Sequence, residues 1–170
     1  MKTILSIIEF VLLLNIAFQD FKTRRINVLL LIFLAVTFIA DGILSLTIYN
    51  YARDIVFNLA FLAFQSIFLI LYFMFRKIPV RNILNSFLGA GDIVFIVIMT
   101  FCFSSMNFIL FYITGLILSL ALWMLTRTFT VNKIEVPLAG YMASFMAIIL
   151  AVTYLYPGFD RFNSILQQAI

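Results

Sequence analysis

The segment Gly89-Ala90-Gly91-Asp92-Ile93-Val94-Phe95-Ile96 sets a carboxylate behind two glycines at the start of an apolar run. Glycine has no Cβ and adopts backbone conformations closed to other residues, so a second peptide could lie against Gly89 and Gly91. An ionisable side chain at the edge of a membrane segment is costly and indicates a functional site with a partner elsewhere. The alternative is structural: Asp92 caps the first turn of a helix, where a negative charge suits the helix dipole.

The composition is that of a polytopic membrane protein. Hydrophobic residues fill 65% of the 170 positions and charged residues only 11%, whereas soluble domains are about half apolar and about a quarter charged. At roughly 20 residues per crossing, six crossings would use about 120 residues, so we expect residues 1–170 to form one membrane domain. The dispersed basic residues favour loops beside anionic lipid over nucleic-acid binding.

Six apolar segments predict an all-α bundle of six transmembrane helices. We expect the first near residues 4–18 and a connection between the second and third that includes residues 41–54. The fourth is expected to begin before Gly89, and Pro137 is expected at the first position of the last helix. The six segments cover approximately residues 4–18, 26–39, 55–75, 93–103, 108–125 and 137–156.

Basic residues are distributed unequally between the two sides of this predicted bundle. Eight fall on loops of one side and three on the other, a bias that places the richer side in the cytoplasm and both termini outside. Asp20, Asp92 and Glu135 then lie at the cytoplasmic edge of the membrane. The acids expected at the opposite face are Asp41, Asp54 and Asp160, and the three basic residues counted there are Lys2, Arg53 and Arg161.

The residue inventory limits the possible chemistry. The chain has no histidine and Cys102 is its one cysteine, which excludes Ser/His and Cys/His nucleophile systems, His-based zinc sites and an internal disulfide. We expect no metal or other cofactor, and Cys102 is expected to be a small buried or lipid-facing residue. Any hydrolytic chemistry must therefore use carboxylates.

Glu9 lies inside the first helix, about 16 Å along the axis from Asp20. This position predicts a protonated or paired structural group facing neighbouring helices, with Asn58 or Gln65 as partner. The alternative is a third functional carboxylate.

Asp20 is the best candidate partner for Asp92, because both are expected at the same edge. Two carboxylates at a partly dry site cannot both ionise cheaply, so one keeps its proton and the pair titrates as a unit. The ionised member could take a proton from a water held between them while the neutral member donates to a carbonyl. This is peptide hydrolysis without a covalent intermediate.

Two arginines follow Asp20 closely. Arg24 is four residues further on and could lie on the same helical face, where it would favour the charged form of Asp20. The alternative is that Arg24 and Arg25 are anchors on anionic lipid.

Asp20-Phe21-Lys22-Thr23-Arg24-Arg25-Ile26, together with Gly89-Ala90-Gly91-Asp92, resembles the type IV prepilin peptidases, membrane aspartic peptidases with a Gly-Xaa-Gly-Asp motif. Val136-Pro137-Leu138-Ala139-Gly140-Tyr141 resembles the Pro-containing segment near the last helix of that family. The resemblance implies that Asp20 and Asp92 are the catalytic pair. It also implies a prepilin or pseudopilin-like substrate, whose short basic leader is cut off at the cytoplasmic face of the inner (cytoplasmic) membrane, just before a hydrophobic helix.

Larger members of the family also methylate the new N-terminus and carry an added domain with Cys-Xaa-Xaa-Cys pairs. With one cysteine, this chain is similar to the short, peptidase-only form, and we expect no methyltransferase activity. Two departures from the family pattern could alter the titration of the pair or the leader preference: Asn27 follows Ile26 without an intervening Pro, and Val94 stands where many members have Lys. Neither departure removes a carboxylate.

Two other functions remain open from the sequence. An intramembrane aspartyl protease of the presenilin kind shares Gly-Xaa-Gly-Asp, but its first Asp sits within an apolar helix, whereas Asp20 is followed at once by a basic loop. A non-catalytic carrier or scaffold would instead use Glu9, Asp20 and Asp92 as ion or proton sites. Substitution of the two aspartates separates these functions.

Overall fold

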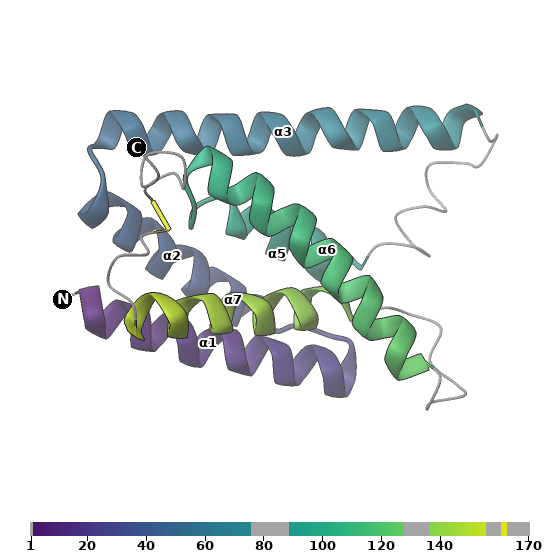
Figure 1. The fold of residues 1–170 in the computed structure, drawn as a ribbon, viewed down its shortest axis with the longest axis horizontal. Coiled ribbons are helices and arrows are strands. Elements are labelled where there is room, and N and C mark those ends of the chain that lie inside the picture. The colour runs from purple at the N-terminus through teal and green to yellow at the C-terminus, as the bar shows by residue number, and fades with distance from the viewer. Residues whose placement is uncertain (1, 76–88, 128–136, 156–160, 163–170) are drawn as a thin grey trace.

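The structure, a computed structural model, describes residues 2–75, 89–127, 137–155 and 161–162. Within these ranges the chain forms six helices and no strand, so the predicted all-α fold is confirmed. Figure 1 shows α1, α2 and α7 grouped together, α6 crossing the bundle, and α3 along the opposite edge. The helices are α1 (Lys2–Thr23), α2 (Val28–Ser45), α3 (Ile48–Phe75), α5 (Ala90–Met99), α6 (Ser105–Arg127) and α7 (Leu138–Leu155).

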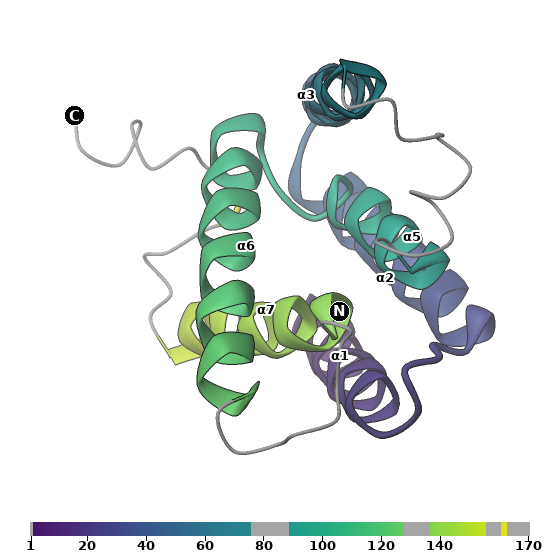
Figure 2. The same cartoon turned by 90° about the vertical axis from the view of Figure 1, so that its right-hand side faces the viewer.

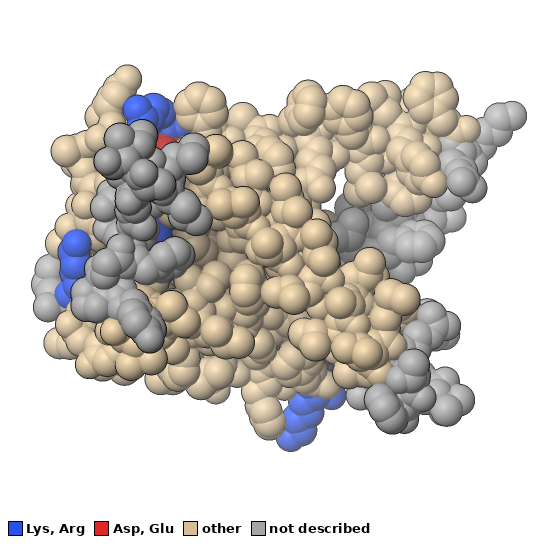
Figure 3. Space-filling view, in the orientation of Figure 1, with Lys and Arg blue, Asp and Glu red and all other residues tan. Residues whose placement is uncertain are grey.

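Five of these helices are long and apolar enough to cross a membrane: α1, α2, α3, α6 and α7. α5 has ten residues, which corresponds to about 15 Å, or about half of a hydrocarbon core. In Figure 3 the charged residues that can be seen lie at the left end and the lower edge, and the rest of the described surface on this face is uncharged. Many large apolar side chains are exposed on the five long helices. These are the features of a membrane protein, in which lipid covers the apolar surface.

The packing of the helices follows their apolar faces. α7 lies beside α1, and α5 lies beside α2, while α3 stands apart from both pairs (Figure 2). Leu13, Ile16 and Ala17 of α1 are buried at helical spacing and share a core with Met142 and Met146 of α7. The α1–α7 contact is therefore the centre of the bundle.

The connection between α2 and α3 is shorter than predicted. α2 continues through Asp41 to its end and α3 begins at Ile48, so Asp41 and Asp54 are helical and the predicted loop over residues 41–54 is wrong. Tertiary contacts explain the difference: Gly42 lies directly against the Tyr51 ring, and the Tyr51 hydroxyl donates to the Phe101 carbonyl at 3.0 Å. Such contacts override the turn-forming tendency of an Asp-Gly pair.

Two helix starts also differ from the expectation. The helix that holds Asp92 begins at Ala90 rather than before Gly89, because Gly89 is the extended N-cap (φ −64°, ψ 135°). α7 begins one residue after Pro137, whose carbonyl accepts from the Tyr141 N–H at 3.1 Å. Pro137 thus occupies the N-cap position, where it offers no side-chain oxygen to the free amides of the first turn.

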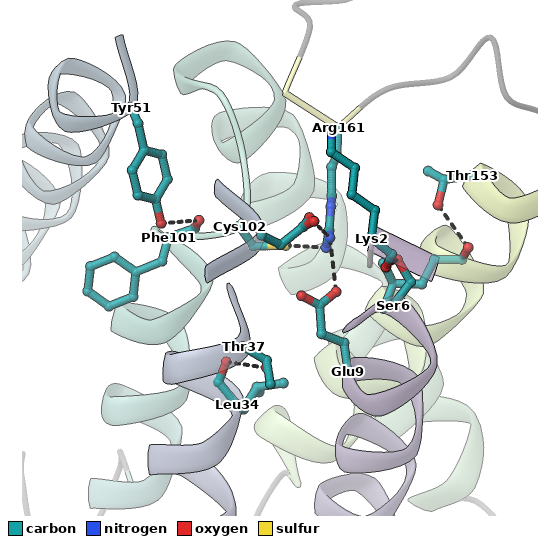
Figure 4. Close-up of polar contacts among 12 residues, drawn as sticks. Lys2, Ser6, Glu9, Leu34, Thr37, Tyr51, Phe101, Cys102, Thr153 and Arg161 are labelled. Carbon is teal, nitrogen blue, oxygen red and sulfur yellow. Dashed lines mark hydrogen bonds and ion pairs between the residues drawn. The ribbon is translucent and has the colours of Figure 1, made fainter. Parts of the chain in front are cut away.

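A buried ion-pair cluster holds the end of the bundle distant from α7's first turn. The Arg161 guanidinium lies between Glu9 of α1 and Asp41 of α2, with Nη2 at 2.9 Å from Glu9 Oε2 and also bonded to Asp41. Its Nη1 lies 3.0 Å from Cys102 Sγ, and Figure 4 shows Arg161 pointing at Glu9 with Cys102 beside it. The cluster pairs charges that would be costly alone in an apolar bundle.

This cluster corrects two expectations. Glu9 pairs with Arg161 rather than with Asn58 or Gln65; the Asn58 side chain donates instead to the carbonyls of Thr100 and Phe103. Arg161 is only 6% exposed, although its charge predicted a loop position. The prediction of a buried Cys102 is confirmed.

The backbone of Arg161 extends the same connection. Its carbonyl accepts from the Asn107 side chain at 2.9 Å and from the Ser104 N–H at 3.3 Å. One residue therefore joins α1 and α2 to the segment between α5 and α6 and to the first turn of α6.

Replacement of Arg161 tests the weight of this cluster. We expect Arg161→Gln to lower the free energy of unfolding by about 3–5 kcal/mol, because it leaves two buried carboxylates without their cation. Unfolding in detergent micelles, followed by circular dichroism, measures the change.

Arg53→Gln is the matched control, because Arg53 is exposed and lines a surface pocket together with Phe162, the residue after Arg161. It should change stability by no more than about 0.5 kcal/mol. Equal changes in the free energy of unfolding for the two substitutions would mean that the buried ion pairs add no more stability than an exposed arginine does.

Candidate active site

The N-terminus of α7 brings together the two aspartates that the sequence pairs. Asp20 Oδ2 of α1 accepts a hydrogen bond from the Gly140 N–H at 2.6 Å. Asp92 Oδ1 of α5 accepts one from the Ala139 N–H at 2.9 Å. Because these amides are consecutive, the two oxygens lie within about 9 Å of each other at most. Residues 72 positions apart in the sequence thus meet at one helix end.

The attraction between this helix end and the two acids has a simple cause. The first amides of a helix have no partner within the helix, and its N-terminus carries a partial positive charge. Pro137 cannot cap them, so carboxylates from two other helices supply the acceptors. Asp20 is 5% exposed, so water weakens its hydrogen bond little, whereas Asp92 is half-buried and its carboxylate is partly open to solvent.

A glycine permits the close approach on the α1 side. A Cβ at Gly140 would lie 2.9 Å from Asp20 Oδ2, 3.2 Å from Asp20 Cβ and 3.1 Å from Phe21 Cε1. Phe21 also packs edge-to-face on Tyr141, with ring centroids 5.1 Å apart. Gly140 is therefore a close-packing point between α7 and α1.

The glycines before Asp92 have different neighbours. A Cβ at Gly89 would lie 2.9 Å from Asp92 Oδ2, and the Asp92 carboxylate is also hydrogen-bonded to the Gly89 backbone. Asp92 therefore caps its own helix from the third position, as the structural alternative predicted, and binds α7 as well. A Cβ at Gly91 would lie 3.4 Å from Ile26 Cδ1, an ordinary van der Waals distance. Approach of a substrate along Gly89 and Gly91 stays a prediction.

Arg24 stands immediately after α1 in a left-handed conformation (φ 55°), and its N–H donates to the Asp20 carbonyl at 3.1 Å. This is the common way for a helix to end, although glycine is the usual residue there. The positive charge of Arg24 acts on both Asp20 and Asp92, in line with the predicted electrostatic support. Arg25 is exposed, which suits the alternative role of a lipid anchor.

The site can hold one proton and one negative charge. The charges of Asp20 and Asp92 act on one another, and two such neighbours do not both ionise cheaply. The amides of Ala139 and Gly140 each donate to a carboxylate, which stabilises the ionised form. Among the described residues, no group of three or more His, Cys, Asp or Glu side chains could hold a metal ion.

No protein-family model, curated protein or solved structure matches this chain. The function must therefore be inferred from the arrangement of the chain's own residues. That arrangement has two readings: a pair of helix caps supplied by other helices, or an acid/base pair held by those caps. The two readings are compatible, because the hydrogen bonds that fix the carboxylates also set their charge.

The other predicted positions fall as follows. Asp41 and Asp54 lie away from the pair: Asp41 is in the Arg161 cluster and Asp54 Oδ1 accepts from Ser105 Oγ at 2.8 Å. Val94, which stands where a Lys is common, is exposed on α5. Asn27 is the N-cap of α2, and its N–H donates to Gln19 Oε1 at 3.0 Å. Glu135 and Asp160 lie outside the described residues.

The sequence did not reveal that backbone amides would hold the pair. The available signal was Pro137, since a proline at a helix start leaves the next amides without a side-chain cap. Nothing in the pattern identified Asp20 and Asp92 as the acceptors.

Substitution of Gly140 tests the close approach. We expect Gly140→Ala to lower the free energy of unfolding by about 1–3 kcal/mol, because the added methyl group meets Asp20 and the Phe21 ring. The measurement is unfolding in detergent micelles.

Gly115→Ala provides the comparison within another helix. Its Cβ would lie 3.1 Å from Met142 Cε, the movable end of a flexible side chain, and alanine favours a helix over glycine by about 1 kcal/mol. We expect no loss of stability there. If Gly140→Ala and Gly115→Ala changed the free energy of unfolding equally, the contact at Gly140 would not be tight.

Proposed function

We propose that this protein is a membrane aspartic endopeptidase that uses Asp20 and Asp92 as its catalytic pair. The observation that carries the proposal is the binding of both carboxylates to consecutive amides of α7, Gly140 N–H and Ala139 N–H. A helix start needs acceptors, but it does not need two acids from two different helices at a site with an arginine nearby. Paired carboxylates in a partly dry site are a known solution to peptide hydrolysis without a covalent intermediate.

In the proposed mechanism, a water lies between the two carboxylates. The ionised aspartate takes a proton from this water, and the water oxygen attacks the peptide carbonyl carbon. The protonated aspartate donates its proton to the carbonyl oxygen, giving a tetrahedral diol. Collapse of the diol breaks the C–N bond, and the nitrogen leaves with a proton returned by the pair.

The substrate and the orientation come from the resemblance to type IV prepilin peptidases. The proposed substrate is a prepilin or pseudopilin-like protein with a basic leader, a glycine and an apolar helix, cut at the cytoplasmic face of the cell (inner) membrane. The proposed enzyme is the short form, without methyltransferase activity. Asp20 lies three residues before the end of α1 at Thr23, which favours a cut at the membrane edge over one within the bilayer.

The carrier alternative has less support. A carrier would use Glu9 as a site that exchanges ions or protons, but Glu9 Oε2 is bound to the Arg161 guanidinium in a fully buried position. That pairing suits a structural role.

Amide substitutions separate catalysis from capping. We expect Asp20→Asn and Asp92→Asn each to abolish cleavage of a co-expressed prepilin, because asparagine cannot exchange the required proton. Asparagine retains an acceptor oxygen for the α7 amides, so both variants should still insert and accumulate. Mass spectrometry of the substrate N-terminus measures cleavage.

Asp54→Asn is the control, because Asp54 lies away from the pair and its amide oxygen can still accept from Ser105. The Asp54→Asn variant should cleave the prepilin as the unchanged protein does. Retained cleavage by either Asp20→Asn or Asp92→Asn would end the proposal that these two residues are catalytic.

Arg24 offers a second test of the same site. Arg24→Gly keeps the left-handed backbone, which glycine adopts freely, but removes a positive charge that favours ionised carboxylate. We expect the acid limb of the pH profile of cleavage to move to higher pH, because ionisation of the pair becomes harder. The measurement is the rate of prepilin cleavage in proteoliposomes across pH.

Arg25→Ala removes an equal charge from an exposed neighbouring position. Its profile should stay close to that of the unchanged protein. The same displacement in both variants would indicate a general effect of surface charge rather than one of Arg24 on the pair.

A further inference from the structure

α3 is the least covered of the long helices. Only 6% of its apolar window is buried, against 28–39% for the other four candidate membrane spans. A cavity of about 600 Å³ separates α3 from α5 and α6 along much of its length. Among the residues that the structure describes, no helix therefore packs closely along one face of α3.

One end of this groove reaches the candidate active site. Its wall includes Ile93, which follows Asp92, and Leu138, which precedes Ala139. Along α3 the groove extends from Leu62 to Phe73, twelve residues, which corresponds to about 16 Å of helix axis. The groove thus ends at residues adjacent in sequence to those of the aspartate pair, and its length is about half the thickness of a hydrocarbon core.

The chemistry of the wall selects an apolar occupant. The lining side chains are mostly aliphatic or aromatic, and none of the described ones is charged. Gln65 contributes an amide and Ser66 a hydroxyl group. In a bilayer, helices associate through close packing rather than through a hydrophobic difference from lipid. A groove between three helices offers more packing surface to a fourth helix than a flat lipid-facing surface does.

We propose that this groove binds the apolar helix of the substrate, with the peptide to be cut at the Ile93–Leu138 end. This inference rests on the proposed function, because it assigns the segment that follows the cut bond. α5 runs from Asp92 along the groove to Val97, so a helix beside it starts at the pair and extends away from it. About eleven residues of the substrate helix are covered, and the remainder contacts lipid.

A photo-crosslinking pair on α3 tests the location. Leu69 lines the groove, whereas Leu71 is not among its lining residues; the two are 41% and 43% exposed. Benzoyl-phenylalanine is placed at each position in the Asp92→Asn protein, which is co-expressed with a prepilin that has a basic leader, a glycine and an apolar helix. We expect position 69 to link to the first eleven residues of that helix at least about fivefold more than position 71.

Equal linking at the two positions would overturn the proposal. So would linking of position 69 only to lipid, or only to a second copy of this chain, because either would show another occupant. These outcomes do not depend on whether Asp92 is catalytic.

A kinetic pair tests the consequence for activity. Leu69→Trp narrows the groove, so we expect KM for the prepilin to rise about tenfold with kcat little changed. Leu71→Trp should leave both constants unchanged. A short leader peptide that spans the cut but lacks the helix should be cleaved equally by all three proteins.

The two proposals fail separately. Cleavage by Asp20→Asn or Asp92→Asn would end the catalytic assignment, whatever the crosslinks show. Abolished cleavage in both, together with an unchanged KM in Leu69→Trp, would overturn the groove alone.

Discussion

The start of α7 is the point on which the arrangement of the bundle depends. Its second and third residues, Ala139 and Gly140, present amides that the helix itself cannot satisfy, and Pro137 offers them no side chain. In an apolar surrounding such amides must find acceptors within the protein. Asp20 and Asp92 provide them, so three helices distant in the sequence are fixed at one place by two hydrogen bonds.

These two bonds also explain how two acids, one buried and one half-buried, can lie within the bundle without unfolding it. An isolated carboxylate in an apolar interior is costly, whereas one that accepts from a helix N-terminus is stabilised by both the hydrogen bond and the dipole. The same donors hold each oxygen in a fixed direction. The same two hydrogen bonds therefore support both the stability of the bundle and the chemistry proposed for this site. A substitution that disturbs these bonds is expected to affect both.

The sequence predicted what depends on local pattern and charge. Apolar segments predicted the helices, and the charge bias separated Asp20 and Asp92 from Asp41 and Asp54, as the structure also does. It could not predict pairings across the chain: Asp20 binds an amide 120 residues later and Glu9 binds a cation 152 residues later. Such partners have no periodic signal, and a backbone amide has no sequence signature at all. A lone Arg161 in a polar tail is typical of a loop, which is why its burial was missed.

The long separation between Glu9 and Arg161 has a consequence for biogenesis. α1 is synthesised first and enters the membrane with Glu9 long before the ribosome reaches residue 161. During that interval the carboxylate must carry a proton or be held by the insertion machinery, because its cation does not yet exist. Arrival of Arg161 then supplies the missing cation, so a chain interrupted before residue 161 keeps Glu9 without its partner.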